Sequence, residues 1–170
     1  MRKLDCTVIL MAFAAPLFGQ RIHVAPETKL LTYDTIFNLE GRTADQLFDK
    51  TKSWFVEYFR EAKEVIRGEL KPSMLKGTFI MGFQQGIIAH EYESDVQVRI
   101  KDGAMKVTIN GITHINPNGT RGYPQEANNV KSDGTLRTGG MYTKPLTFLE
   151  GRYHELVLSL RAYLDKKDDF

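Results

Sequence analysis

Residues 91–114 read EYESDVQVRIKDGAMKVTINGITH, two segments in which apolar and polar residues alternate on either side of Asp102-Gly103. An Asp-Gly pair in this position is typical of a two-residue turn that joins antiparallel strands. If Lys101 pairs with Ala104, one face of the hairpin is apolar and the other is polar. The pairs predicted on the apolar face are Ile100–Met105, Val98–Val107, Val96–Ile109 and Tyr92–Thr113. The pattern predicts a sheet with one face in the core and one face exposed.

The exposed face of this hairpin carries charges of both signs. The residues at one end are acidic: Glu91, Glu93 and Asp95. The residues at the other end are basic: Arg99, Lys101 and Lys106. The same register places His114 opposite Glu91 and Asn110 opposite Asp95. Because the acidic end repels phosphates, we expect no nucleic acid partner.

Two segments have the spacing of amphipathic helices. The first is predicted over residues 43–64, where Thr43 and Gln46 have the spacing of a capping box. We interpret Trp54 and the rest of its apolar stripe as residues that pack on the core. The stripe comprises Leu47, Phe48, Thr51, Trp54, Phe55, Tyr58, Phe59 and Ala62. The second helix is predicted from Thr147 to about Lys166, with another capping box between Thr147 and Glu150.

Further strands are predicted at residues 30–39, 65–70 and 74–83. Glycines in and after the last of these predict a bend. The resulting order is strand, helix, four strands, helix. It predicts a single α+β domain over residues 30–166, with a curved antiparallel sheet of about five strands and two helices packed on one face. Its remaining segments are a predicted long loop at 116–147, an N-terminal extension at 20–29 and a tail at 167–170.

Residues 1–19 have the layout of a secretory signal peptide. Arg2 and Lys3 precede a mostly apolar run over 7–18, and Gly19 offers a small residue for cleavage. The run is too short to span a membrane, which takes about 20 apolar residues. Cys6 is the only cysteine of the chain, so the mature protein is expected to hold no thiol and no disulfide. We therefore expect an exported protein without a membrane span, in the periplasm or at the cell surface.

The leader and the packing residues of several elements together point to a known family. The residues that carry the likeness are Tyr33, Phe37, Leu47, Trp54, Phe55, Phe59, Val65-Ile66 and Lys76-Gly77-Thr78. From Thr32 to Leu164 the pattern resembles an uncharacterised family of exported proteins from Bacteroides-type bacteria, with a fold like that of the TATA-box-binding protein. The resemblance implies this fold and an envelope location, and it implies no activity.

Three groups of residues are candidates for a functional site. The row Glu91, Glu93 and Asp95 offers oxygen ligands to a hard cation, although a charged, solvated surface is the simpler interpretation. Glu91 and His114 have the pairing of a carboxylate-oriented imidazole for acid–base chemistry, or of an ordinary cross-strand ion pair. The long loop holds amphipathic and basic residues that suit adaptable contacts: Arg121, Tyr123, Arg137 and Tyr142.

A formal net charge of +2 argues against a general polyanion binder. We expect a non-enzymatic binding or assembly module, without a cofactor, that contacts another envelope protein or a surface polymer. Its contacts are predicted to involve the exposed sheet face, with Arg99, and the 116–147 loop. One alternative is an acid–base hydrolase or metal-binding protein built on the Glu91, Glu93, Asp95 and His114 face. The other is a small-ligand sensor with a pocket between helix and sheet, beside Trp54 or Tyr58.

Overall fold

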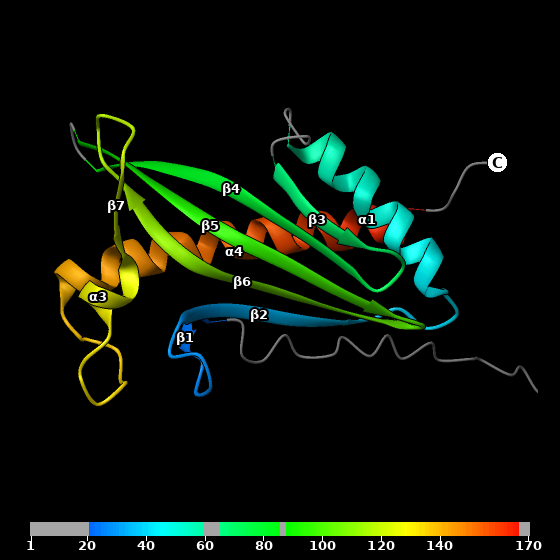
Figure 1. The fold of residues 1–170 in the computed structure, drawn as a ribbon, viewed down its shortest axis with the longest axis horizontal. Coiled ribbons are helices and arrows are strands. Elements are labelled where there is room, and N and C mark those ends of the chain that lie inside the picture. Colours follow the sequence, from blue (N-terminus) through cyan, green and yellow to red (C-terminus); the bar gives the residue numbers. More distant parts are fainter. Residues whose placement is uncertain (1–20, 60–64, 86–87, 167–170) are drawn as a thin grey trace, which may run out of the picture.

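The computed structural model describes residues 21–59, 65–85 and 88–166. Its seven-stranded sheet has the order β1-β2-β6-β5-β4-β3, and β7 pairs with β6 (Figure 1). The strands are β1 (His23–Val24), β2 (Leu31–Asn38), β3 (Ile66–Leu70), β4 (Met74–Gln85), β5 (Ile88–Lys101), β6 (Ala104–Ile115) and β7 (Arg121–Pro124). The helices are α1 (Ala44–Tyr58), α3 (Gln125–Asn129) and α4 (Gly140–Asp165). The predicted antiparallel α+β fold is confirmed, and the short strands β1 and β7 account for the difference in strand number.

Helix α1 begins where the sequence predicts. The Thr43 hydroxyl accepts the N–H of Gln46 at 3.3 Å, and the Gln46 side chain accepts the N–H of Thr43 at 3.0 Å. The predicted capping box is therefore confirmed. Asp102, in the turn between β5 and β6, accepts the first backbone N–H of the helix at 2.7 Å, which places a carboxylate at the positive end of the helix dipole. The helix ends at Tyr58, and the predicted helical residues from 60 to 64 lie outside the described residues.

Helix α4 begins at Gly140, earlier than the predicted start at Thr147. The capping box predicted for Thr147 and Glu150 is wrong, because both residues lie inside the helix. Leu146 is buried in the core, so the added turns cover apolar surface that the sequence pattern places in a loop. Pro145 lies in these added turns, and proline is the residue that normally argues against a helix interior.

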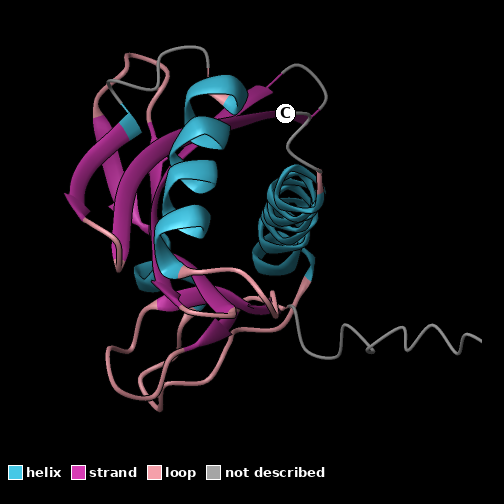
Figure 2. Ribbon diagram, turned by 90° about the vertical axis from the view of Figure 1, so that its right-hand side faces the viewer, coloured by secondary structure: helices cyan, strands magenta, loops and turns pink. Residues whose placement is uncertain are grey.

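Both long helices lie on one side of the sheet (Figure 2). Their apolar stripes and the inward residues of the strands form one core. Aromatic rings run through it, with ring centroids 5.7 Å apart for Phe59 and Phe79, 6.2 Å for Phe79 and Tyr153, and 5.7 Å for Tyr153 and Tyr33. Trp54 is only 2% exposed, as expected of a packing residue. No helix within the described ranges is long and apolar enough to cross a membrane.

The register of the β5–β6 hairpin is confirmed from the turn as far as Asp95, which pairs with Asn110. Beyond it the register shifts by one residue, so that Gly111 and Ile112 both lie opposite Ser94. Gly111 has a φ of +62°, a left-handed conformation that glycine adopts without strain, and it marks a β-bulge. The bulge turns Ile112 into the core, where it is fully buried, although the alternating pattern places it on the exposed face.

Two predicted cross-strand pairs are wrong because of this bulge. His114 lies opposite Tyr92, not opposite Glu91, and Tyr92 therefore does not pair with Thr113. Glu91 lies opposite Ile115 instead. Since directly paired residues share a face of the sheet, His114 lies on the face that carries the core.

The segment predicted as a long loop holds short elements. β7 extends the sheet beside β6, and α3 follows it directly. Buried Gln125 and Asn129 join the ends of α3, since the Asn129 side-chain amide donates to the Gln125 backbone and side-chain carbonyls at 3.0 Å each. In the predicted extension, β1 pairs with β2. The predicted signal peptide, residues 1–19, and the tail, 167–170, lie outside the described residues.

Tyr33 makes the stability sensitive to alkaline pH. Burial, and secondarily the negative charge of Glu150, raises the pKa of Tyr33 from 10.0 to about 12. The folded protein thus holds this proton more tightly than the unfolded chain does, and the stabilisation present below pH 10 is lost as the pH rises through 12. Over this pH range we expect the free energy of unfolding of wild type to fall by on the order of 2 kcal/mol more than that of Tyr33→Phe.

Urea denaturation of both proteins at several alkaline pH values measures this difference. The substitution also removes the contact between the Tyr33 hydroxyl and His154 Nδ1 at 3.4 Å, which shifts the whole Tyr33→Phe curve by a constant. Parallel curves for the two proteins would show that Tyr33 is not the group responsible.

Candidate functional site

One face of the sheet carries no helix. In Figure 1, α4 passes behind β4, β5 and β6, so the view looks onto this face. We call it the open face and define it by the outward residues of four neighbouring strands. They are Asp34, Ile36 and Asn38 of β2, Ala104, Lys106, Thr108 and Asn110 of β6, Glu91, Glu93, Asp95, Gln97, Arg99 and Lys101 of β5, and Lys76, Thr78 and Ile80 of β4.

The acidic end of the open face is ordered by local contacts. Glu93 forms an ion pair with Arg121 of β7, at 2.5 Å between Oε1 and Nη2. Asp95 accepts a hydrogen bond from the Thr78 hydroxyl at 2.8 Å. The Asp95 carboxylate also lies over Gly111, where an added Cβ would come within 2.8 Å of Oδ2, so the bulge makes room for it.

The structure does not gather the acidic row around a common point. Within the described ranges, no three side chains of the His, Cys, Asp and Glu types come together in a way that could hold a metal ion. Glu91, Glu93 and Asp95 stand in line along β5, where Glu93 contacts Arg121 and Asp95 contacts Thr78. The three carboxylates therefore do not form the cage of oxygen ligands that a hard cation needs.

His114 belongs to an aromatic cluster on the other face. Its ring centroid lies 5.3 Å from that of Tyr92 and 5.8 Å from that of His90. Burial, with the neighbouring charge of His90 as a further cause, lowers the pKa of His114. The predicted pair of His114 with Glu91 does not form, so the acid–base arrangement proposed for these two residues is absent from the described structure.

The basic end of the open face contains a hollow of about 330 Å³. Ala104 lies directly between Asn38 on β2 and Lys101 on β5, and its short side chain leaves the space. Ile36, which is 65% exposed, forms an apolar wall. We call this the basic hollow, and its lining residues are Ile36, Asn38, Arg99, Ile100, Lys101, Ala104, Met105 and Lys106.

The cations around the basic hollow differ in their pairing. Lys106 forms an ion pair with Asp34 at 2.9 Å. Arg99 and Lys101 are exposed, and no ion pair joins them to any residue that the structure describes. Two of the three positive charges at the rim are therefore not neutralised by an ion pair within the described residues.

The candidates from the predicted loop fall in two places. Arg121 reaches the open face through Glu93, as described above. Arg137 lies over the ring of Tyr142, 5.7 Å from its centroid, at the start of α4. Tyr123 belongs to β7, and its side chain lies outside what the structure describes. Of these four residues, Arg121 is therefore the one whose described contacts include a predicted candidate of the sheet face, Glu93.

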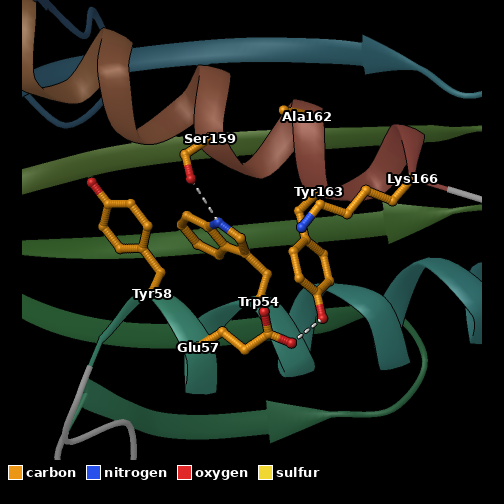
Figure 3. Close-up of a pocket in the computed structure, with 7 residues that line it drawn as sticks. All are labelled: Trp54, Glu57, Tyr58, Ser159, Ala162, Tyr163 and Lys166. Atoms are coloured by element: carbon orange, nitrogen blue, oxygen red, sulfur yellow. Dashed lines mark hydrogen bonds between the residues drawn. The ribbon is translucent and has the colours of Figure 1, made fainter.

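A second hollow, of about 290 Å³, lies between α1 and α4 (Figure 3). It adjoins Trp54 and Tyr58, but its far wall is α4, and not the sheet as the sequence analysis expected. Sequence reasoning missed its remaining lining residues: Glu57, Ser159, Ala162, Tyr163 and Lys166. Their spacing of three and four along each helix could have placed them on one face, but it does not reveal which two faces meet.

The order and packing of the elements define an α+β protein with a fold like that of the TATA-binding protein. One similar solved structure is a DUF4468 family protein from Bacteroides ovatus ATCC 8483, with a sequence identity of 14% and a TM-score of 0.65. The match covers 86% of this chain and 93% of that chain. Another is a TBP-like protein from Parabacteroides distasonis ATCC 8503, with 10% identity, 85% and 99% covered, and a TM-score of 0.65. No family model and no curated protein matches the chain. The predicted resemblance to Bacteroides-type proteins of this fold is confirmed, and at these identities it concerns the fold alone.

Proposed function

We propose that the protein is an exported, non-enzymatic binding module of the bacterial envelope. It holds an acidic segment of another envelope protein at the basic end of the open face. The observation that carries the proposal is the basic hollow, which combines an apolar wall with two exposed cations that have no ionic partner in the described structure. The signal-peptide layout of residues 1–19 supports the location.

The basic hollow offers a partner two kinds of contact. An apolar side chain fits against Ile36 and Ala104, and each Å² of apolar surface removed from water contributes about 25 cal/mol. Flanking carboxylates pair with Arg99 and Lys101, and exposed ion pairs of this kind each add only about 0.2–1 kcal/mol. The apolar contact therefore supplies most of the affinity, while the charges accelerate association and fix the orientation.

The acidic end of the open face restricts how the partner lies. Glu91 and Asp95 repel carboxylates, so an acidic segment does not extend over the whole face. Arg121, whose side chain is 72% exposed, makes the rim beside Glu93 locally mixed in charge. A segment whose charge changes sign along its length fits this surface better than a uniform polyanion does.

Charge reversal at the basic hollow tests the proposal. We expect the double variant Arg99→Glu and Lys101→Glu to retain its fold, because both side chains are exposed. The amount of partner that it retains is expected to fall at least about tenfold. The measurement is quantitative cross-linking and pull-down from native envelope, with the purified protein as bait and the cross-linked peptides identified by mass spectrometry.

The matched control carries the same change of charge outside the basic hollow, at Lys131→Glu and Lys144→Glu, two exposed cations that no ion pair joins to a described residue. The proposal is supported if wild type and the control both retain a protein that the Arg99 and Lys101 variant loses. The cross-linked peptide of that protein must also be acidic. Equal retention by all three baits, or capture of a polysaccharide in place of a protein, would contradict it.

A further inference from the structure

The hollow between α1 and α4 is built from one short stretch of each helix. Residues 54, 57 and 58 of α1 face residues 159, 162 and 163 of α4 and Lys166, the residue that follows α4 (Figure 3). The lining residues on each side are spaced three or four apart, as on one face of a helix. Ala162 leaves space in the α4 wall because its side chain is a single methyl group. Lys50 of α1 donates to the backbone carbonyl of Lys166 at 2.6 Å and so ties the end of α4 to α1.

Trp54 is held rigidly at the floor of this hollow. Its indole N–H donates to the Ser159 hydroxyl at 3.2 Å. The ring of Tyr58 stacks on the indole, with centroids 4.9 Å apart and planes inclined by 28°. Phe55 and Phe59 contact it edge-on, at 5.1 and 5.8 Å between centroids. The aromatic wall is therefore in place before any ligand arrives, which reduces the entropy lost on binding.

The rim of the hollow is polar and balanced in charge. Glu57 accepts a hydrogen bond from the Tyr163 hydroxyl at 2.6 Å. Lys166 places its ammonium over the Tyr163 ring, 5.0 Å from the centroid. One carboxylate and one ammonium thus flank the opening, together with the Ser159 hydroxyl. A free anion meets Glu57 there and a free cation meets Lys166, so neither is favoured.

We propose that this hollow binds one neutral, polyhydroxylated ring, such as a single monosaccharide unit. The apolar C–H face of such a ring packs on the exposed part of the Tyr58 ring, which itself stacks on the buried indole of Trp54. Its hydroxyls donate to the Glu57 carboxylate and exchange hydrogen bonds with Ser159. The volume of about 290 Å³ lies at the small end of ligand pockets, which suits one ring and excludes a larger ligand.

Tryptophan fluorescence reports on this site alone, because Trp54 is the only tryptophan in the chain. The probes are glucose, galactose and N-acetylglucosamine, with tetramethylammonium chloride and sodium acetate as charged comparisons. We expect a saturable change in Trp54 emission with at least one of the sugars, at a Kd on the order of millimolar, and none with either salt.

Two variants show whether such a signal comes from the hollow. Ala162→Leu fills the gap from an exposed helical position, and we expect it to weaken sugar binding at least tenfold. Thr147→Leu places a leucine at another exposed position of α4 and is expected to leave binding unchanged. Glu57→Gln keeps the size of the side chain but removes its charge, and we expect binding several-fold weaker, which tests the site without any change of packing.

Circular dichroism establishes that each variant is folded before titration. The proposal is overturned if no sugar gives a saturable response. It is also overturned if the response survives both Ala162→Leu and Glu57→Gln, or if tetramethylammonium or acetate binds more tightly than every sugar. Because the hollow lies on the helical side of the sheet, these outcomes are independent of the partner proposed for the open face.

Discussion

Replacing Gly77 with valine is expected to destabilise the protein by about 3 kcal/mol. A Cβ at this position would lie 2.8 Å from the backbone oxygen of Val65 and 3.3 Å from Phe55 Cε1. The first contact is with main chain next to β3, so relief requires a shift of backbone rather than a new rotamer. The two further methyl groups of valine enlarge the clash in a core that is already filled.

Gly82→Val provides the matched control on the same strand. A Cβ at Gly82 would meet its nearest neighbours, Glu91 Cγ and the His90 oxygen, at 3.6 Å, an ordinary van der Waals distance. Valine also suits a strand, so we expect a change within about 0.5 kcal/mol. Urea denaturation of the two variants measures the difference. Equal effects would mean that the close packing at Gly77 does not limit the side chain there.

Tyr153→Ala is expected to cost about 4 kcal/mol, the largest effect of any single substitution considered for this fold. Tyr153 is fully buried, and its ring makes edge contacts with those of Tyr33 and Phe79. Its hydroxyl also shares a hydrogen bond of 2.6 Å with the buried Ser94 hydroxyl. Alanine leaves a cavity between α4 and the sheet and removes the partner of Ser94.

Tyr153→Phe separates these two losses. It keeps the ring and removes the hydroxyl, so we expect a cost of about 1–2 kcal/mol from the polar group left behind on Ser94. Adding Ser94→Ala to Tyr153→Phe is expected to recover part of that cost, because neither side then carries a buried hydroxyl. Thermal or urea unfolding of wild type, Tyr153→Phe, Ser94→Ala and the double variant completes a double-mutant cycle. A phenylalanine variant as unstable as the alanine variant would contradict the assignment of most of the loss to the cavity.

Local sequence signals predicted the parts of the fold that depend on neighbouring residues. The Asp102-Gly103 turn and the alternation around it predicted the correct pairing from Lys101 with Ala104 to Asp95 with Asn110. The capping box at Thr43 predicted the start of α1 to the residue. Both signals act through contacts within a few residues, which a sequence displays directly.

The errors arise where one residue or one distant contact changes the outcome. The bulge at Gly111 shifts the register by a single position, and Asn-Gly-Ile-Thr continues the alternation well enough to hide it. The glycine at position 111 was the available signal in the sequence. The bulge that it marks also places His114 opposite Tyr92, on the face that carries the core. The early start of α4 depends on burial of Leu146 against other elements, which overrides the loop-like composition around Pro145.

The candidate sites were predictable to different degrees. Alternation along β5 placed Glu91, Glu93, Asp95, Arg99 and Lys101 on the outward face correctly, because the extra residue of the bulge lies in β6 and the alternation along β5 is not interrupted. The basic hollow was not predictable, because it requires knowing that β2 lies beside β6 and brings Ile36 next to Lys106. The hollow between α1 and α4 likewise depends on which helical faces meet.

One face of the sheet packs on the helices and the other is exposed (Figure 2), and this difference has a practical consequence for protein engineering. The outward positions of β4, β5 and β6 contribute little to the core, because the buried residues of these strands all point toward the helices. A combinatorial library randomised at outward positions such as Lys76, Thr78, Gln97 and Thr108 can therefore be displayed on an unchanged framework. Such a scaffold offers a paratope on the strands of a twisted sheet, unlike the loop-borne paratopes of antibodies (Figure 1).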